Sequence, residues 1–262
     1  MPTVSSRPRI LVICSALVTA LLAVALLAPL PFSIVMPGAT ADTLGSQNGR
    51  PVITIDGTST RQTRGKLLLT TIMATAPDAS VKLSNVLSAW LDDQEAAMPR
   101  STVYPEGDTE KEITKHNREQ MRTSQHEATL AALDHMGLSP RRVKVTLELA
   151  DVGGPSAGLM FSLGIIDKIQ GDGRGGDLTG GRTIAGTGTI TASGEVGPVG
   201  GVPLKVVAAR RDGATVFLLP RSECSQASEN LPDGLRLVPV RDLDDAVSAL
   251  KALSSGGKVP SC

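Results

Sequence analysis

Two segments of the chain each contribute one residue to a pair that can carry out covalent chemistry. Ser156 lies in the run Gly153-Gly154-Pro155-Ser156-Ala157-Gly158, and Lys205 lies in the apolar run Leu204-Lys205-Val206-Val207. A serine hydroxyl needs a neighbouring base to become a nucleophile, and a lysine amine serves as that base when burial keeps it neutral. The pair therefore predicts a Ser-Lys dyad.

The residues beside Ser156 favour an anion-binding turn. Gly154 and Gly158 flank Pro155 and Ala157, so the chain can bend sharply and bring backbone N–H groups together. The apolar run 159–166 predicts a buried helix that begins at this turn, and its N-terminal amides also favour negative charge there. The alternative is an ordinary glycine-rich connection that holds an unreactive serine.

Four blocks of the sequence, in this order and spacing, resemble the catalytic domain of Lon proteases. They are Gly-Gly-Pro-Ser-Ala-Gly at 153–158, Ala-Gly-Thr-Gly-Thr-Ile at 185–190, Gly-Glu-Val-Gly-Pro-Val-Gly-Gly at 194–201, and Leu-Lys followed by Val-Val-Ala-Ala at 204–209. The resemblance implies that Ser156 is the nucleophile, Lys205 the general base and Thr187 a threonine that orients the lysine. It also implies an α+β fold of the ribosomal protein S5 domain 2-like kind, and a homo-oligomer that can be a hexameric ring.

The sequence most resembles the membrane-anchored Lon-like proteins of bacteria, which join a transmembrane helix, a PDZ domain and a Lon-type peptidase domain. Two departures stand out. ATP-dependent Lon enzymes commonly have an aspartate where this chain has Gly153, and the segment 135–140 leaves no room for a PDZ domain between the long helix and the next strand. We therefore expect a Lon-type domain without PDZ-based peptide capture.

The N-terminal segment predicts a membrane anchor. Residues 10–30 form a run of 21 residues without a charge, which as a helix spans roughly the 30 Å of a bilayer core. Arg7 and Arg9 precede the run and no acidic residue does, so the N-terminus is expected in the cytoplasm of a bacterial cell and the rest outside it. A cleaved signal peptide is the alternative.

Cysteine and histidine usage fits an exported, metal-free chain. Cys14 lies in the predicted span, and Cys224 and Cys262 are the only exported cysteines, so we expect a disulfide between them, with two unrelated thiols as the alternative. The three histidines, His116, His126 and His135, lie on one polar stretch that also holds Glu127 and matches no metal-binding spacing. No metal or cofactor is expected.

Composition argues against several other functions. The net charge is zero, and no basic cluster has interleaved aromatic residues, because Trp90 and Tyr104 are the only Trp and Tyr. We therefore expect no nucleic-acid partner. No segment matches a Walker phosphate-binding loop, so we expect no ATP dependence. The expected partners are a polypeptide substrate, the membrane and other copies of the chain.

Hydrophobic periodicity and turn residues predict the remaining elements. Strands are expected at 52–55 and 66–72 with a turn at Asp56-Gly57, and then at 143–149, 183–190, 215–219 and 235–240. Helices are expected at 84–92, 109–136, 202–210 and 242–250, with Thr109 and Glu112 as a capping box and Gly137 as the stop. The segment 99–108 is expected to be a loop. No strict βαβ repeat is present, so the class is α+β.

These observations predict an organisation and a function. The expected parts are a cytoplasmic N-terminus at 1–9, a transmembrane anchor at 10–35, an N-terminal part of the exported domain at 36–140, a Lon-type core at 141–252 and a tail at 253–262. The expected activity is cleavage of flexible polypeptides by Ser156, with backbone amides near Gly154, Pro155, Ala157 and Gly158 holding the oxyanion. A catalytically idle scaffold is the alternative. A small-molecule kinase of the GHMP type, which has a similar serine loop, is a weaker one.

Overall fold

The computed structural model describes residues 6–104, 109–149 and 154–262. The chain divides into two compact units. Unit 1 comprises residues 1–36 and 74–107, and unit 2 comprises residues 37–73 and 108–262. Two long strands, β1 (Phe32–Asp42) and β5 (Lys66–Ala74), each contain a unit boundary.

A sheet with a parallel centre forms the framework of unit 2. β5 pairs in parallel with β8 (Thr183–Gly186), β8 with β11 (Val216–Pro220), and β11 with β12 (Arg236–Val240). The order in this unit is β12-β11-β8-β5-β1. Carboxyl ends of parallel strands lie at the same edge of a sheet, so the residues that follow β8 and β11 are brought close together.

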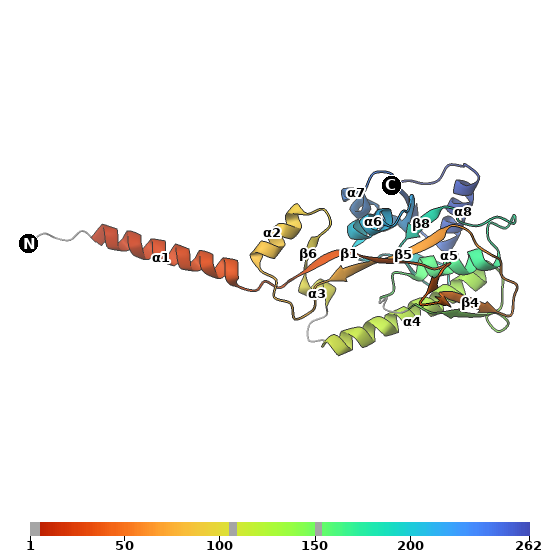
Figure 1. The fold of residues 1–262 in the computed structure, drawn as a ribbon, viewed down its shortest axis with the longest axis horizontal. Helices are drawn as coiled ribbons and strands as arrows, with labels where there is room; N and C mark the ends of the chain where they lie inside the picture. The colour runs from red at the N-terminus through yellow and green to blue at the C-terminus, as the bar shows by residue number, and fades with distance from the viewer. Residues whose placement is uncertain (1–5, 105–108, 150–153) are drawn as a thin grey trace, which may run out of the picture. The chain divides into compact units, whose positions relative to one another are not determined.

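Side-chain alternation along these strands creates two apolar layers. Val216 and Leu218 of β11 belong to one buried cluster, and Phe217 and Leu219 belong to the other. Helices cover both faces, which is why the central strands are apolar throughout rather than alternating with polar residues. α5 (Gly158–Ile169), α4 (Glu110–His135) and α8 (Leu243–Ser254) pack in the first cluster, and α6 (Val202–Arg211) and α7 (Cys224–Glu229) pack in the second (Figure 1).

The long helix α4 follows its sequence signals closely. Thr109 accepts a hydrogen bond from the Glu112 amide, and the Glu112 carboxylate accepts one from the Thr109 amide, which completes the predicted capping box. The helix ends at His135, and Gly137 follows with a φ of 65°. Its C-terminal half is buried against α5, whereas most of its first two turns are exposed.

Short strands complete unit 2. β4 (Ile53–Asp56) pairs antiparallel with β7 (Lys144–Leu147), and β9 (Thr189–Ile190) pairs antiparallel with β10 (Val196–Gly197). β2 (Ser46–Gln47) and β3 (Arg50–Pro51) form a small hairpin. Asp56 ends β4 as the turn signal at Asp56-Gly57 predicted. β4 pairs with β7, and the following strand β5 pairs with β8.

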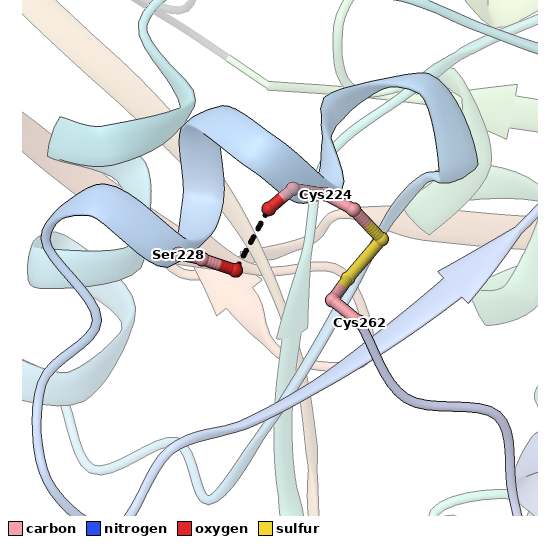
Figure 2. Close-up of a disulfide and its surroundings, with 3 residues drawn as sticks. All are labelled: Cys224, Ser228 and Cys262. Carbon is pink, nitrogen blue, oxygen red and sulfur yellow. Dashed lines mark hydrogen bonds between the residues drawn. A yellow bond between two sulfur atoms is a disulfide. The ribbon is translucent and has the colours of Figure 1, made fainter.

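A disulfide joins the C-terminal tail to the short helix α7. Cys224 is bonded to Cys262, and their Cα atoms are 5.3 Å apart. Figure 2 shows Cys262 beside the first turn of α7, where the Ser228 hydroxyl donates a hydrogen bond to the Cys224 carbonyl oxygen at 2.8 Å. The one-turn 3₁₀ helix Arg221–Glu223 links α7 to β11. Cys14 is a free cysteine.

Unit 1 contains the apolar helix α1 (Ser6–Leu27), α2 (Leu83–Leu91), β6 (Ala96–Pro99) and the single turn α3 (Arg100–Val103). β6 pairs antiparallel with residues 32–35 of β1. Residues 9–27 of α1 form a helix that is long and apolar enough to cross a membrane. A loop was expected at 99–108, but residues 100–103 form a helical turn, stabilised by a hydrogen bond from the Tyr104 amide to the Arg100 carbonyl.

Candidate active site

Ser156 lies in the tight turn that leads into α5. Gly154 has a φ of 85°, which a residue with a Cβ rarely adopts, so glycine lets the chain reverse there. Gly158 begins the helix at a crowded point, where an added Cβ would lie 2.8 Å from the Ile190 side chain. The Pro155 carbonyl accepts a hydrogen bond from the Ser124 hydroxyl of α4 at 2.9 Å. The turn is thus fixed from two sides.

The carbonyl oxygen of Ser156 is tied to the segment that follows β8. It accepts hydrogen bonds from the Gly188 amide at 2.9 Å and from the Thr187 hydroxyl at 3.3 Å. The Leu159 amide in turn donates to the Gly188 carbonyl at 3.2 Å. The Ser156 hydroxyl itself makes no hydrogen bond to another described residue. It remains available to a substrate and a base.

Thr187 connects Ser156 with Lys205. The Lys205 ammonium group donates to the Thr187 hydroxyl at 3.1 Å, and the same hydroxyl donates to the Ser156 carbonyl. A hydroxyl has one proton and two lone pairs, so it can take both roles at once. Thr187 is fully buried, and its amide donates to the Leu218 carbonyl of β11 at 3.0 Å, which fixes its backbone at the edge of the sheet.

Lys205 is held on the first turns of α6, with 3% of its surface exposed. Burial disfavours the charged amine and lowers the pKa of Lys205 to about 8, while the negative charge of Glu223 acts in the opposite direction. A lysine with this pKa is neutral in about one molecule in ten at pH 7. The side chain can therefore take up a proton under ordinary conditions, which an exposed lysine cannot.

Comparison with known proteins identifies the region that carries these residues. Residues 143–252 match the family described as the Lon protease (S16) C-terminal proteolytic domain. Residues 143–252 form a Lon-type proteolytic domain. The remaining residues of the chain lie outside the match.

Curated Lon proteases also resemble part of the chain. Lon protease 2 of Bacillus subtilis is 29% identical over 136 residues, which cover 51% of this chain and 23% of that protein. The Lon protease of Chloroflexus aggregans is 34% identical over 97 residues, and that of Roseiflexus castenholzii is 35% identical over 98 residues. Each of these two alignments covers 36% of this chain and 11% of the relative. The chain thus spans less than a quarter of the length of these relatives.

The Lon-type domain brings together most of the predicted site. Thr187 contacts both Lys205 and Ser156, and Gly154, Pro155, Ala157 and Gly158 form the turn around the serine. Gly153, where ATP-dependent relatives commonly have an aspartate, lies outside the described residues. The segment between α4 and β7 comprises residues 136–143 only.

The sequence alone did not predict one charged residue near the site of the Lon-type domain. Glu223 is buried in the turn after β11, and one of its carboxylate oxygens has no hydrogen-bond partner among the described residues. Among the described residues, it is the charged group that raises the pKa of Lys205. A single glutamate in a polar segment gives no local signal. The parallel pairing of β8 with β11 would have given one, because it places the chain after β11 beside Thr187.

Two of the three histidines, His116 and His135, form side-chain hydrogen bonds. His116 shares a hydrogen bond with Gln120 at 2.9 Å, and His135 pairs with Asp244 of α8 at 2.6 Å. Within the described ranges, no three His, Cys, Asp or Glu side chains gather in a group that could hold a metal ion.

Proposed function

We propose that this chain is a membrane-anchored serine endopeptidase that cleaves flexible or unfolded polypeptides without ATP, using Ser156 and Lys205 as a dyad. The observation that carries the proposal is the buried chain of contacts from Lys205 through Thr187 to Ser156. Its support is the similarity of residues 143–252 to the proteolytic domain of Lon.

In the first step, the Ser156 Oγ attacks the carbonyl carbon of the substrate and its proton passes to the neutral amine of Lys205. Lys205 donates one N–H to Thr187, and this contact restricts the orientation of its amine. The developing oxyanion is stabilised by backbone amides of the turn around Ser156, where α5 begins, whereas the Leu159 amide is already bonded to the Gly188 carbonyl. A covalent bond from Oγ to the carbonyl carbon results.

In the second step, the C–N bond of the peptide breaks and Lys205 returns the proton to the departing amine. The acyl group remains on Ser156. A water molecule then gives a proton to Lys205 while its oxygen attacks the acyl carbon, and the Ser156 Oγ leaves with that proton. The cycle restores neutral Lys205 and needs neither a metal ion nor a nucleotide.

The anchor and the disulfide support an extracytoplasmic location. Residues 9–27 satisfy the length and hydropathy of a single membrane span. Arg7 and Arg9 favour a cytoplasmic N-terminus. The bond between Cys224 and Cys262 fits an oxidising compartment. We place the catalytic domain outside the bacterial cytoplasmic membrane, in a homo-oligomer of this chain.

The full-length protein in detergent micelles, incubated with a chemically unfolded polypeptide, tests the function. We expect fragments to accumulate equally with and without ATP, and Ser156→Ala to produce none. Ser193→Ala serves as the matched control, because Ser193 is an exposed serine of the same domain. A fluorophosphonate probe that labels neither the native protein nor Ser156→Ala, together with intact substrate, would favour the idle scaffold instead.

A further inference from the structure

Helix α2 in unit 1 has two apolar faces, and only one of them is covered. Ala89 packs in a small cluster with Ile34 and Val81, and Val86 contacts the same cluster. The other face consists of Leu87, Trp90 and Leu91, which are 46%, 80% and 90% exposed. Their spacing of three and four residues places them on one stripe of the helix. Exposed apolar residues gathered in this way mark a contact surface.

This stripe lies close to the point where α1 ends. α1 extends to Leu27, and the Leu30 amide donates a hydrogen bond to the Val81 carbonyl at 2.7 Å, two residues before α2 begins. Residues of α1 and α2 are also in contact within unit 1. If α1 crosses a membrane, the beginning of α2 is held within a few residues of the membrane surface.

We propose that the face formed by Leu87, Trp90 and Leu91 inserts into the interface of the membrane that α1 crosses. The inference rests on the proposed membrane anchoring, and it adds a second lipid contact to the span. Tryptophan is enriched at membrane interfaces, where its ring is apolar and its N–H reaches polar groups. Amphipathic helices with such a face lie in the plane of the interface.

The chemistry of α2 indicates which lipid surface it fits. The helix itself contains no charged residue, and the nearest flanking charges are Lys82 on one side and Asp92 and Asp93 on the other. Attraction to anionic head groups therefore contributes little. We expect α2 to bind a zwitterionic surface by apolar contact, with little dependence on salt.

Trp90 is the only tryptophan of the chain, so its fluorescence reports on this face alone. The experiment uses full-length protein reconstituted in phosphatidylcholine vesicles whose acyl chains carry bromine either near the head group or near the chain end. We expect a blue-shifted emission that is quenched more strongly by bromine near the head group. The same quenching is expected at low and high salt.

A second pair of variants distinguishes membrane contact from a structural role. Leu87→Ser combined with Leu91→Ser keeps Trp90 and removes its apolar neighbours, and we expect it to lose at least about half of the bromine quenching. Ser84→Ala combined with Ser88→Ala changes exposed polar positions of the same helix and should leave the quenching unchanged. Peptide hydrolysis should be unaffected in both.

Two results would overturn the inference. Emission as red as that of the urea-unfolded chain, without quenching, would show that Trp90 faces water. Blue-shifted emission that neither lipid quenches would show that a second protein copy covers the face. The anchor is tested separately by extraction at alkaline pH: a chain that is extracted while Trp90 is quenched at neutral pH refutes the span of the proposed function but supports the contact of α2.

Discussion

Lys205 and Asp167 are both buried ionisable side chains, and they lie on helices that cover opposite faces of the sheet in unit 2. Asp167 of α5 has a charged partner, because Arg61 contacts it at 3.4 Å and also pairs with Asp177 at 3.3 Å. The amide of Leu178 donates to Asp167 at 2.7 Å. Lys205 has only the neutral hydroxyl of Thr187 as a hydrogen-bond partner, and forms no ion pair with another described residue.

The difference in partners fits two different roles: Asp167 holds the structure of a loop, whereas Lys205 is suited to act as a base. Arg61 also donates to the Gly175 carbonyl at 3.0 Å, so the Asp167 cluster fixes the loop between α5 and β8. A lysine with such a partner would keep its proton and could not act as a base. Among the described residues, Lys205 has no acidic side chain within ion-pair distance, and Glu223 influences its pKa from farther away. Partial desolvation without pairing is the environment that a general base requires.

The largest expected effect comes from removing the base. Lys205→Met keeps the length and apolar stem of the side chain but has no amine, and Lys205→Arg keeps a charge that cannot be lost near neutral pH. We expect both to lower kcat/KM for peptide hydrolysis by at least about a thousandfold, as for other members of a proton-transfer unit. Hydrolysis is measured on the full chain, with circular dichroism as the check of folding.

Combining Lys205→Met with Ser156→Ala should cost little more than either change alone, because the two residues act in one proton transfer. The dyad is refuted by a folded Lys205→Met protein that retains a tenth or more of the native rate.

The sequence predicted the elements with local signals and missed those that depend on distant contacts. The capping box at Thr109 and the glycine stop at Gly137 define α4 to within about a residue. Ser156 and Lys205 were predicted because a serine nucleophile needs a base, and Thr187 was predicted only from the resemblance of its block to the Lon catalytic domain. In contrast, β1 begins only a few residues after an apolar span and contains Pro37 and Gly38, so its pattern is obscured.

Local sequence patterns also could not predict the parallel pairing of β5, β8, β11 and β12. Their partners are separated by long stretches of chain, and only the packing of helices on both faces selects the order. Glu223 was missed for the same reason, since its relation to Lys205 exists only once β8 and β11 are adjacent.

A second, smaller effect concerns Asp167. Burial, with the nearby charge of Asp177, raises the pKa of Asp167 to about 6, although the Leu178 amide and Arg61 act in the opposite direction. In the unfolded chain the carboxyl titrates near 3.8. The folded state therefore binds the proton more tightly. The resulting stabilisation is complete below about pH 4 and is lost as the pH rises through about 6.

Asp167→Asn imitates the protonated carboxyl and does not titrate. Relative to the native chain, its free energy of unfolding should improve between pH 4 and pH 7.5 by up to about 3 kcal/mol, which corresponds to a shift of about two pKa units. Urea unfolding at the two pH values measures this difference, with Asp233→Asn, at an exposed aspartate of the same unit, as the control. If the difference in unfolding free energy between Asp167→Asn and the native chain does not change with pH, the charge of Arg61 offsets the whole cost of burying the Asp167 carboxylate.

The smallest effect is expected for substitution of Glu223. It tests directly how a carboxylate that forms no ion pair with Lys205 affects the pKa of this lysine. For the native chain, kcat/KM should rise with pH and level off above about pH 8, as Lys205 loses its proton. Glu223→Gln removes the charge that raises the pKa of Lys205, so the inflection should move to lower pH. Activity at pH 7 should increase, but by less than about tenfold, because about a tenth of Lys205 is already neutral there.

Two further variants separate charge from shape at this position. Glu223→Asp keeps the charge and should keep the inflection near that of the native chain, whereas Glu229→Gln, at an exposed position at the end of α7, should leave the profile unchanged. A shift of the inflection toward higher pH in Glu223→Gln would mean that the substitution exposes the lysine to water, so that Glu223 acts by keeping Lys205 buried rather than through its charge. The lowered pKa of Lys205 would then result only from its burial in the second apolar layer. Lys205 and the paired Asp167 would differ only in how strongly burial acts on them.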